Sequence, residues 1–180
     1  MIKDNPNNNI VLIGFMGSGK STVGKYIAKE HPSNIAGDKT YNFIDTDEYI
    51  VQTQGMPITE IFATKGEEYF RELETKTLKY FKDNCKDTVF STGGGMPLRT
   101  ENAHVLKEIG VVVYLRATAD TIYGRVKDDT GRPLLQVDDP YERICELLTE
   151  REAKYMAAAD KIVDTDGKSL EDIVNYIFDL

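Results

Sequence analysis

The chain has 180 residues, of which 41% are hydrophobic and 29% are charged, a composition typical of one globular domain with a substantial core. Its net charge of −8 argues against non-specific binding to nucleic acid, because neutralising phosphates requires clustered lysine and arginine. No apolar run approaches the roughly 20 residues that span a bilayer, and Cys85 and Cys145 have neither metal-ligand spacing nor a disulfide framework. We expect a cytoplasmic monomer that binds neither nucleic acid nor membrane.

Short apolar runs alternate with helical patterns along the chain. Such runs, bounded by polar residues or glycine, are typical of strands that are buried on both faces of a parallel sheet. We predict strands over residues 9–14, within 41–47, from 87 into the glycines at 93–95, over 111–117 and over 161–165. We predict helices over residues 21–30, 48–54, 58–62, 67–84, 100–109, 119–127, 140–159 and 170–180, and a polar segment over 128–139.

This alternation predicts an α/β fold in three layers, with a parallel sheet between helices on both faces. Residues 1–9, "MIKDNPNNN", are polar and rich in asparagine, so we expect them to be a flexible leader. Residues 10–180 should then form a single domain.

The first motif is "GFMGSGKS", Gly14–Ser21, which fits G-x-x-x-x-G-K-[ST] between a predicted strand and a predicted helix. Glycines there let backbone N–H groups curl around phosphate oxygens, and the helix N-terminus adds partial positive charge. Lysine can reach the terminal phosphates, and serine can offer its hydroxyl to Mg²⁺. A glycine-rich turn with a surface lysine is the weaker interpretation. The expected nucleotide-binding residues are Gly17, Ser18, Gly19, Lys20, Ser21 and Thr22.

Two aspartates, Asp45 and Asp47 in "FIDTDEY", follow the second predicted strand. Ligands bind at the carboxyl ends of strands in parallel sheets, and residues two apart on an extended chain point to one side. One carboxylate could orient Mg²⁺ while the other accepts a proton or hydrogen bond from a hydroxyl. The alternative is that either one caps the following helix.

The third predicted strand runs into Gly93, Gly94 and Gly95. Tight curvature explains one or two of them, whereas three also allow the backbone to approach a ligand closely.

Three arginines suggest different environments. Arg71 has Glu67 and Glu74 at helical spacing, so surface ion pairing is the simpler interpretation. Arg151 has no acidic residue three or four positions away on its helix, which leaves a binding role open, although a surface position is still the simpler interpretation. Arg132 lies in the turn-rich segment "DDTGRPLL", which suggests a lid over about residues 128–139 that brings charge to a transferring phosphoryl group.

Taken in order, these motifs resemble the shikimate kinase family over Ile10–Leu180. The matching segments are "GFMGSGKSTVGKYIA", "FIDTDEYI", "IFATKGEEYFRELE", "VFSTGGG", "VVVYL", "GRPLL" and "LTEREAKYMAAAD". The resemblance implies a P-loop kinase fold like that of nucleoside monophosphate kinases, with a five-stranded parallel sheet, a substrate-binding helical region at about 47–84 and a closing lid. It also implies transfer of the γ-phosphoryl group of ATP to the 3-hydroxyl of shikimate, on the route to chorismate and the aromatic amino acids.

The same resemblance implies roles for individual residues. Lys20, Arg132 and Asp47 would be catalytic, and Arg125 would lie against adenine. Ser21 would hold Mg²⁺ directly and Asp45 through water. The residues implied for shikimate are Asp47, Arg71, Gly93, Gly94, Gly95, Arg151, Phe62 and Phe70, the two phenylalanines as apolar walls.

Two rival interpretations stay open. Another small-molecule P-loop kinase, for gluconate or a nucleotide, would share the phosphate loop and lid. A non-catalytic ATP-binding module would share the loop but would have no need of Asp45, Asp47 and Arg132.

Overall fold

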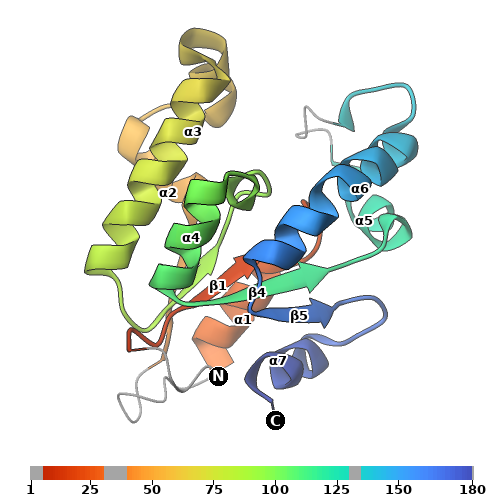
Figure 1. The fold of residues 1–180 in the computed structure, drawn as a ribbon. Coiled ribbons are helices and arrows are strands. Elements are labelled where there is room, and N and C mark those ends of the chain that lie inside the picture. Colours follow the sequence, from red (N-terminus) through yellow and green to blue (C-terminus); the bar gives the residue numbers. More distant parts are fainter. Residues whose placement is uncertain (1–5, 31–39, 130–134, 180) are drawn as a thin grey trace.

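The structure is a computed structural model, and it describes residues 6–30, 40–129 and 135–179. Within these residues five strands form one parallel sheet in the order β2-β3-β1-β4-β5 (Figure 1). The strands are β1 (Ile10–Ile13), β2 (Asn42–Asp45), β3 (Thr88–Ser91), β4 (Val111–Arg116) and β5 (Lys161–Asp164). The predicted three-layer α/β fold is confirmed.

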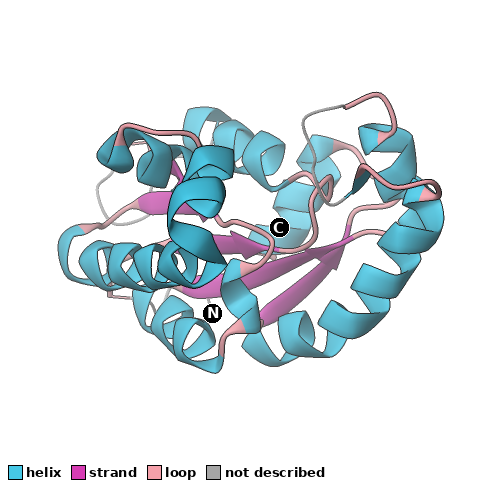
Figure 2. Cartoon of the chain, turned by 90° about the horizontal axis from the view of Figure 1, so that it is seen from above, coloured by secondary structure: helices cyan, strands magenta, loops and turns pink. Residues whose placement is uncertain are grey.

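Helices cover both faces of the sheet, as Figure 2 shows from above. One face packs against α1 (Lys20–Glu30) and α7 (Leu170–Phe178), and the other against α3 (Ile58–Asn84), α4 (Thr100–Ile109) and α6 (Pro140–Ala158). The described residues also form two shorter helices, α2 (Thr46–Gln54) and α5 (Ala119–Val126), and the 3₁₀ helix η2 (Met96–Leu98). None of the helices in the described ranges is long and apolar enough to cross a membrane.

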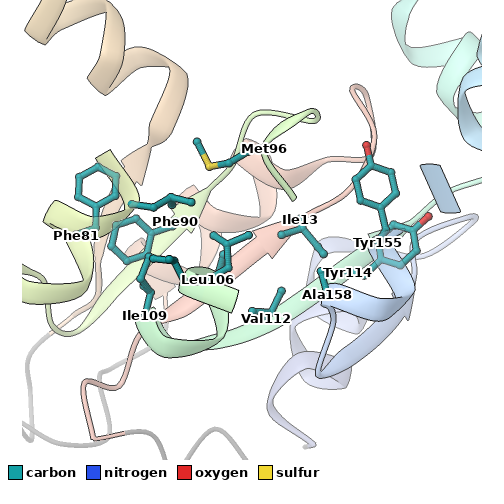
Figure 3. Close-up of a cluster of buried hydrophobic side chains, with 13 residues drawn as sticks. Ile13, Phe81, Phe90, Met96, Leu106, Ile109, Val112, Tyr114, Tyr155 and Ala158 are labelled. Carbon is teal, nitrogen blue, oxygen red and sulfur yellow. The ribbon is translucent and has the colours of Figure 1, made fainter. Parts of the chain in front are cut away.

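The central strand shows why the layers form. Ile10 and Leu12 point toward the α1 and α7 side, and Val11 and Ile13 toward the α3, α4 and α6 side. All four are fully buried, because a strand covered on both faces needs apolar side chains at every position. Figure 3 shows the second of these cores, which runs from Phe81 to Tyr155.

The strand register brings the carboxyl ends of β1, β2 and β3 together. β1 pairs in parallel with β3 on one side and with β4 on the other, so the strands that follow it in the chain lie on both sides of it. Leu12 and Asp45 both pair with Ser91. The segments that follow β1, β2 and β3 therefore emerge side by side, where α/β proteins bind ligands.

The predicted helices over 58–62 and 67–84 form one continuous element with a kink. Gly66, at φ 85° and ψ 165°, is the non-helical residue inside α3. Only glycine adopts this conformation without strain, so the expected gap between two helices is a bend at one residue.

The expected leader also differs at its end. Asn8 and Asn9 are buried, and the Asn9 side chain donates to the Cys85 and Ile109 carbonyls and accepts from the Thr88 N–H. Asn8 and Asn9 are therefore part of the packed structure and not of a flexible leader.

Candidate active site

The phosphate loop joins β1 to α1 at the carboxyl edge of the sheet. Gly17 and Gly19 have φ values of 76° and 100°, which side chains rarely tolerate. A Cβ on Gly17 would lie 2.7 Å from Val126 Cγ1. The loop therefore curls tightly, and the N-terminus of α1 faces the space above it.

Lys20 and Ser21 begin α1 and face the same space. The Lys20 side chain is only 8% exposed, and its Nζ donates to the carbonyls of Gly14 and Phe15 at 2.9 Å each. Ser21 Oγ donates to Asp45 Oδ2 at 2.9 Å and lies 3.0 Å from Ser91 Oγ. The loop is thus tied to β2 and β3 by hydroxyl and carboxylate oxygens.

A cavity of about 310 Å³ lies over the loop. It brings together the first motif, both aspartates and the glycine run. Its lining residues are Met16, Gly17, Gly19, Lys20, Ser21, Thr22, Asp45, Asp47, Ser91, Thr92, Gly93 and Gly94.

We expected Asp45 and Asp47 to lie on one extended segment, and this prediction is wrong. Asp45 ends β2, and the chain turns into α2 at Thr46. Asp45 Oδ1 accepts from the N–H groups of Asp47 and Glu48, so Asp45 is the helix cap while its other oxygen binds Ser21. The capping alternative holds for Asp45, and Asp47 is left for another role.

Asp47 projects from the first turn of α2 against the glycine run. A Cβ on Gly93 would lie 2.6 Å from Asp47 Oδ1, and this oxygen is buried without a hydrogen-bond partner among the described residues. Burial, followed by the charge of Asp45, raises the pKa of Asp47 to about 6, although the charges of Lys20 and Arg71 lower it. Asp47 therefore lies within electrostatic reach of both cations.

Gly93 and Gly95 each have a steric reason to lack a side chain, whereas a Cβ on Gly94 would make only ordinary contacts, the nearest at 3.5 Å. Gly93 makes room for Asp47, and a Cβ on Gly95 would lie 2.6 Å from Nη1 of Arg71. The Gly94 carbonyl accepts from Tyr155 Oη at 2.6 Å. The run is a place where two charged side chains approach the backbone closely, not merely a tight turn.

Arg71 forms the ion pairs that its helical spacing predicts, and one of its two partners is buried. Its Nη2 donates to Glu67 and its Nη1 to Glu74, each at 2.9 Å. Glu67 is exposed, whereas the Glu74 side chain is 1% exposed. Burial raises the pKa of Glu74 to about 7, against the lowering effect of Arg71, so Arg71 is oriented from inside the protein by a carboxyl group that titrates near neutrality.

A second cavity, of about 380 Å³, lies next to Arg71. It gathers three arginines from different elements around a patch of backbone. Its lining residues are Glu67, Glu68, Arg71, Gly95, Leu98, Arg99 and Arg151. We call it the acid pocket, because clustered guanidinium groups bind carboxylates through charge-assisted hydrogen bonds.

Arg99 and Arg151 reach the acid pocket in different ways. Arg99 is paired with Glu68. Arg151 lies with its guanidinium carbon 5.6 Å from the centre of the Phe15 ring, a residue of the phosphate loop. The surface position that the sequence favoured for Arg151 is not what the structure shows, since its guanidinium lies over Phe15 and lines the acid pocket.

Sequence reasoning missed three residues here. Arg99 carries no motif of its own, and its place after the glycine run was the one signal available. Glu74 was seen only as a surface partner for Arg71, although it is buried and accepts a hydrogen bond from the Arg71 guanidinium on its inner side. Tyr155, one helical turn after Arg151, reaches the Gly94 carbonyl.

Three further expected residues, Phe62, Phe70 and Arg125, line neither of the two cavities. Phe62 and Phe70 pack edge to face with ring centres 4.9 Å apart, and Arg71 lies 5.5 Å from the Phe70 ring, yet neither ring lines the acid pocket in the described structure. Arg125 Nη1 donates to the Gly17 carbonyl at 3.0 Å. Arg132 and much of the expected lid lie outside the described residues.

The site fits a magnesium ion. Mg²⁺ prefers hard oxygen ligands, keeps several waters and is held by one or two protein groups together with substrate phosphates. Ser21 and Asp45 supply a hydroxyl and a carboxylate beside the phosphate loop. Within the described ranges no cluster of three or more metal-binding side chains occurs.

Comparisons with known proteins agree with this geometry. Residues 16–180 match the family Shikimate kinase. The shikimate kinase of Thermodesulfovibrio yellowstonii is 45% identical over 94% of this chain and 92% of its own length, and that of Geobacter sulfurreducens is 43% identical over 94% and 88%. A shikimate kinase from Acinetobacter baumannii, solved in complex with shikimate, has a TM-score of 0.82 at 35% identity and covers 94% of this chain and 90% of that chain.

A gluconokinase from Sinorhizobium meliloti 1021 is also similar, with a TM-score of 0.50 at 18% identity. This likeness shows a shared fold alone.

Proposed function

The chain belongs to the shikimate kinase family, and from that premise we infer that it transfers the γ-phosphoryl group of ATP to the 3-hydroxyl of shikimate. The products are shikimate 3-phosphate and ADP, on the route to chorismate and the aromatic amino acids. One observation carries the assignment: the phosphate loop lies next to an arginine-lined acid pocket. The charges of Lys20 from the loop and Arg71 from the pocket both lower the pKa of Asp47.

The phosphate loop binds the nucleotide. Backbone N–H groups of Gly17, Ser18 and Gly19 and the N-terminus of α1 receive the phosphates, and Lys20 exchanges its two carbonyl contacts for phosphate oxygens. Thr22 completes the loop. Arg125, already at the loop, meets adenine, and Arg132 brings positive charge to the transferring group from a lid over about 128–139.

Members of the family use ATP, generally with a divalent metal, and we propose Mg²⁺ with Ser21 as a direct ligand and Asp45 as a ligand through water. When bound, the ion neutralises charge on the phosphates. Asp45 keeps its orientation because its other oxygen caps α2.

The acid pocket binds shikimate. Arg71 and Arg151 hold the substrate carboxylate, Gly93, Gly94 and Gly95 allow the ring to approach the backbone, and Phe62 and Phe70 limit the pocket. Two guanidinium groups give both strength and orientation, because each can form paired hydrogen bonds.

Asp47 meets the reacting hydroxyl, aligns it and takes its proton. A base works best when its pKa lies near the operating pH, and burial has moved the Asp47 pKa to about 6. Phosphoryl transfer requires little further chemistry from the protein, since positioning and charge neutralisation dominate.

We also propose that residues 10–180 act as one domain, with the substrate region at about 47–84, and that the enzyme is a cytoplasmic monomer without nucleic-acid or membrane partners. The net charge of −8 supports one part of this proposal, the absence of nucleic-acid partners, because it disfavours association with polyanions.

An ADP-release assay with ATP and Mg²⁺ tests the function. Shikimate, gluconate and a set of nucleoside monophosphates are offered in parallel, together with a blank without acceptor. We expect turnover with shikimate and with none of the other acceptors. Turnover with gluconate or a nucleotide would assign the chain to another P-loop kinase activity, and ATP binding without turnover on any acceptor would make it a binding module.

A further inference from the structure

Arg99 lines the acid pocket, but the mechanism above gives it no task. It follows η2 and directly precedes α4, and its guanidinium pairs with Glu68 of α3, the helix that lies beside α4 in Figure 1. The Arg99 side chain is 33% exposed and that of Glu68 is 76% exposed. Ion pairs this open to water contribute little to stability, so the pair alone does not account for an arginine at this place.

Positive charge exceeds negative charge at the lining of the acid pocket. Three arginines and two glutamates line it, although the whole chain has a net charge of −8. Arg71 pairs with two carboxylates, one of them on the buried Glu74. In the described part of the chain, Arg99 has an ion pair with the exposed Glu68 alone. A carboxylate that enters the pocket therefore takes Arg99 from its partner more easily than Arg71, because no buried carboxylate loses its partner.

The backbone that carries Arg99 is fixed by hydrogen bonds, in contrast to its side chain. The turn η2 is closed by a backbone hydrogen bond to the Gly95 carbonyl at 3.1 Å, and the buried Asn102 side chain donates to the Met96 carbonyl at 3.1 Å. Arg71 lies against the start of the same turn, since a Cβ on Gly95 would be 2.6 Å from its Nη1. Arg99 thus leaves a turn of set geometry beside the guanidinium of Arg71.

We propose that Arg99 is a further substrate-binding residue of the acid pocket, whose guanidinium exchanges Glu68 for the carboxylate of the incoming acceptor. Its charge adds to those of Arg71 and Arg151 and draws the anion toward them, since charges attract over about 8 Å at physiological ionic strength. The proposal rests on the function proposed above, because it names a further residue that selects an anionic acceptor at the same pocket.

The test compares Arg99→Gln with Lys79→Gln. Each change removes one positive charge and one ion pair from α3 to the region of α4, because Lys79 pairs with Glu101, but only Arg99 lines the acid pocket. Dissociation constants for shikimate are measured by titration calorimetry in the presence of ADP. We expect Arg99→Gln to raise this constant about fivefold, the size of one partly exposed ion pair, with kcat and the KM for ATP unchanged. Lys79→Gln should leave all three values unchanged.

Glu68→Gln separates substrate binding from a purely structural role of the pair. If Glu68 competes with the acceptor for Arg99, its neutralisation should lower the dissociation constant for shikimate about twofold. If the pair only joins α3 to the end of η2, Glu68→Gln and Arg99→Gln should weaken shikimate binding alike. That result would overturn the proposal.

Salt and a charge-conserving variant give two further measurements. The fivefold difference between Arg99→Gln and the unmodified enzyme should shrink to about twofold when the ionic strength rises from about 0.05 M to about 0.5 M, because salt screens an exposed charge. Arg99→Lys keeps the charge and should bind shikimate within about twofold of the unmodified enzyme. A difference that does not depend on salt, or an Arg99→Lys variant as weak as Arg99→Gln, would overturn the proposal.

Melting temperatures of the free proteins check the folding of each variant. Equal dissociation constants for folded Arg99→Gln and Lys79→Gln would overturn the proposal. If Arg99→Gln does not fold, Glu68→Gln decides, and unchanged or weaker binding of shikimate by that variant would overturn the proposal as well. Failure of the unmodified enzyme to bind and phosphorylate shikimate would instead overturn the proposed function.

Discussion

The phosphate loop and the acid pocket bind anions in different ways. The loop is one contiguous stretch whose donors are largely backbone N–H groups, and its lysine donates to the loop's own carbonyls. The acid pocket takes Arg71, Arg99 and Arg151 from three elements, and two of these already hold glutamates of the same chain. A phosphate therefore enters a site made ready by the backbone, whereas a carboxylate must displace or join carboxylates that are already there.

The largest expected effect breaks the loop side. Lys20→Ala should lower kcat about 10³-fold, because a positioned charge on the transferring group is lost. The change also leaves the Gly14 and Phe15 carbonyls without their donor, so a small fall in melting temperature is expected. The measurement is steady-state turnover together with thermal unfolding.

The matched control is Lys25→Ala, which removes an exposed lysine from the same helix and should leave kcat unchanged. Near-normal turnover of Lys20→Ala would remove this loop from the catalytic site.

Asp47→Asn tests the group between the two regions. Asparagine keeps the size and one acceptor but cannot take up a proton at neutral pH, so we expect a loss in kcat of about 10²-fold, with a smaller change in shikimate affinity. Glu48→Gln, which neutralises the next carboxylate of α2, is the control. Retained kcat with weakened shikimate binding would show that Asp47 only positions the hydroxyl.

Asp47→Asn should lower activity but increase the stability of the fold at high pH. The pKa of Asp47 is about 6 in the folded chain and about 4 when unfolded, so the ionised carboxylate favours unfolding above pH 6. This cost, at most about 3 kcal/mol, fades as the pH falls from 6 toward 4. Asp47→Asn should therefore raise the melting temperature at pH 8 but not at pH 4, and a fall at pH 8 would contradict the burial argument.

The pH profile is the next smaller effect. Because Asp47 must be ionised to accept a proton, kcat/KM for shikimate should fall as the pH drops through about 6 and be about tenfold below its plateau one unit lower. The limb should vanish in Asp47→Asn. Glu74→Gln is the control, because Glu74 titrates nearby with a pKa of about 7. The decrease at low pH should persist in this variant. Loss of the limb in the latter variant would transfer it to Glu74.

The smallest effect sharpens the acid side. Glu67 is exposed and holds Arg71, so it competes with the substrate carboxylate for the same guanidinium. Glu67→Gln should lower the KM for shikimate about two- to threefold, the size expected of an exposed ion pair. Glu72→Gln, an exposed carboxylate on the same helix, should have no effect. A higher KM in Glu67→Gln would mean that the pair helps binding.

The difference between the regions also explains what could be predicted from sequence. The strands, the helices and the loop depend on local patterns, so their positions followed from apolar runs and from one contiguous motif. The acid pocket depends on which side chains meet across α3, η2 and α6, and spacing along one helix could pair Arg71 only with its own glutamates. The prediction that Asp45 and Asp47 lie on an extended chain is wrong for a related reason. A helix that begins at Thr46, one residue after the strand, cannot be told from an extended chain by polarity alone.

The order of the strands has a consequence for how the protein is made. Ile10 lies in the middle of the sheet, between Val89 and Val111, so during synthesis β1 waits for partners that lie about 80 and 100 residues later in the chain. Until then its apolar side chains have no sheet to enter, and the phosphate loop has no rigid frame. Pairings this distant in sequence make folding slow and leave the nascent chain prone to aggregation. The centre of the sheet, which is its most protected part once folded, is thus its most vulnerable part during synthesis.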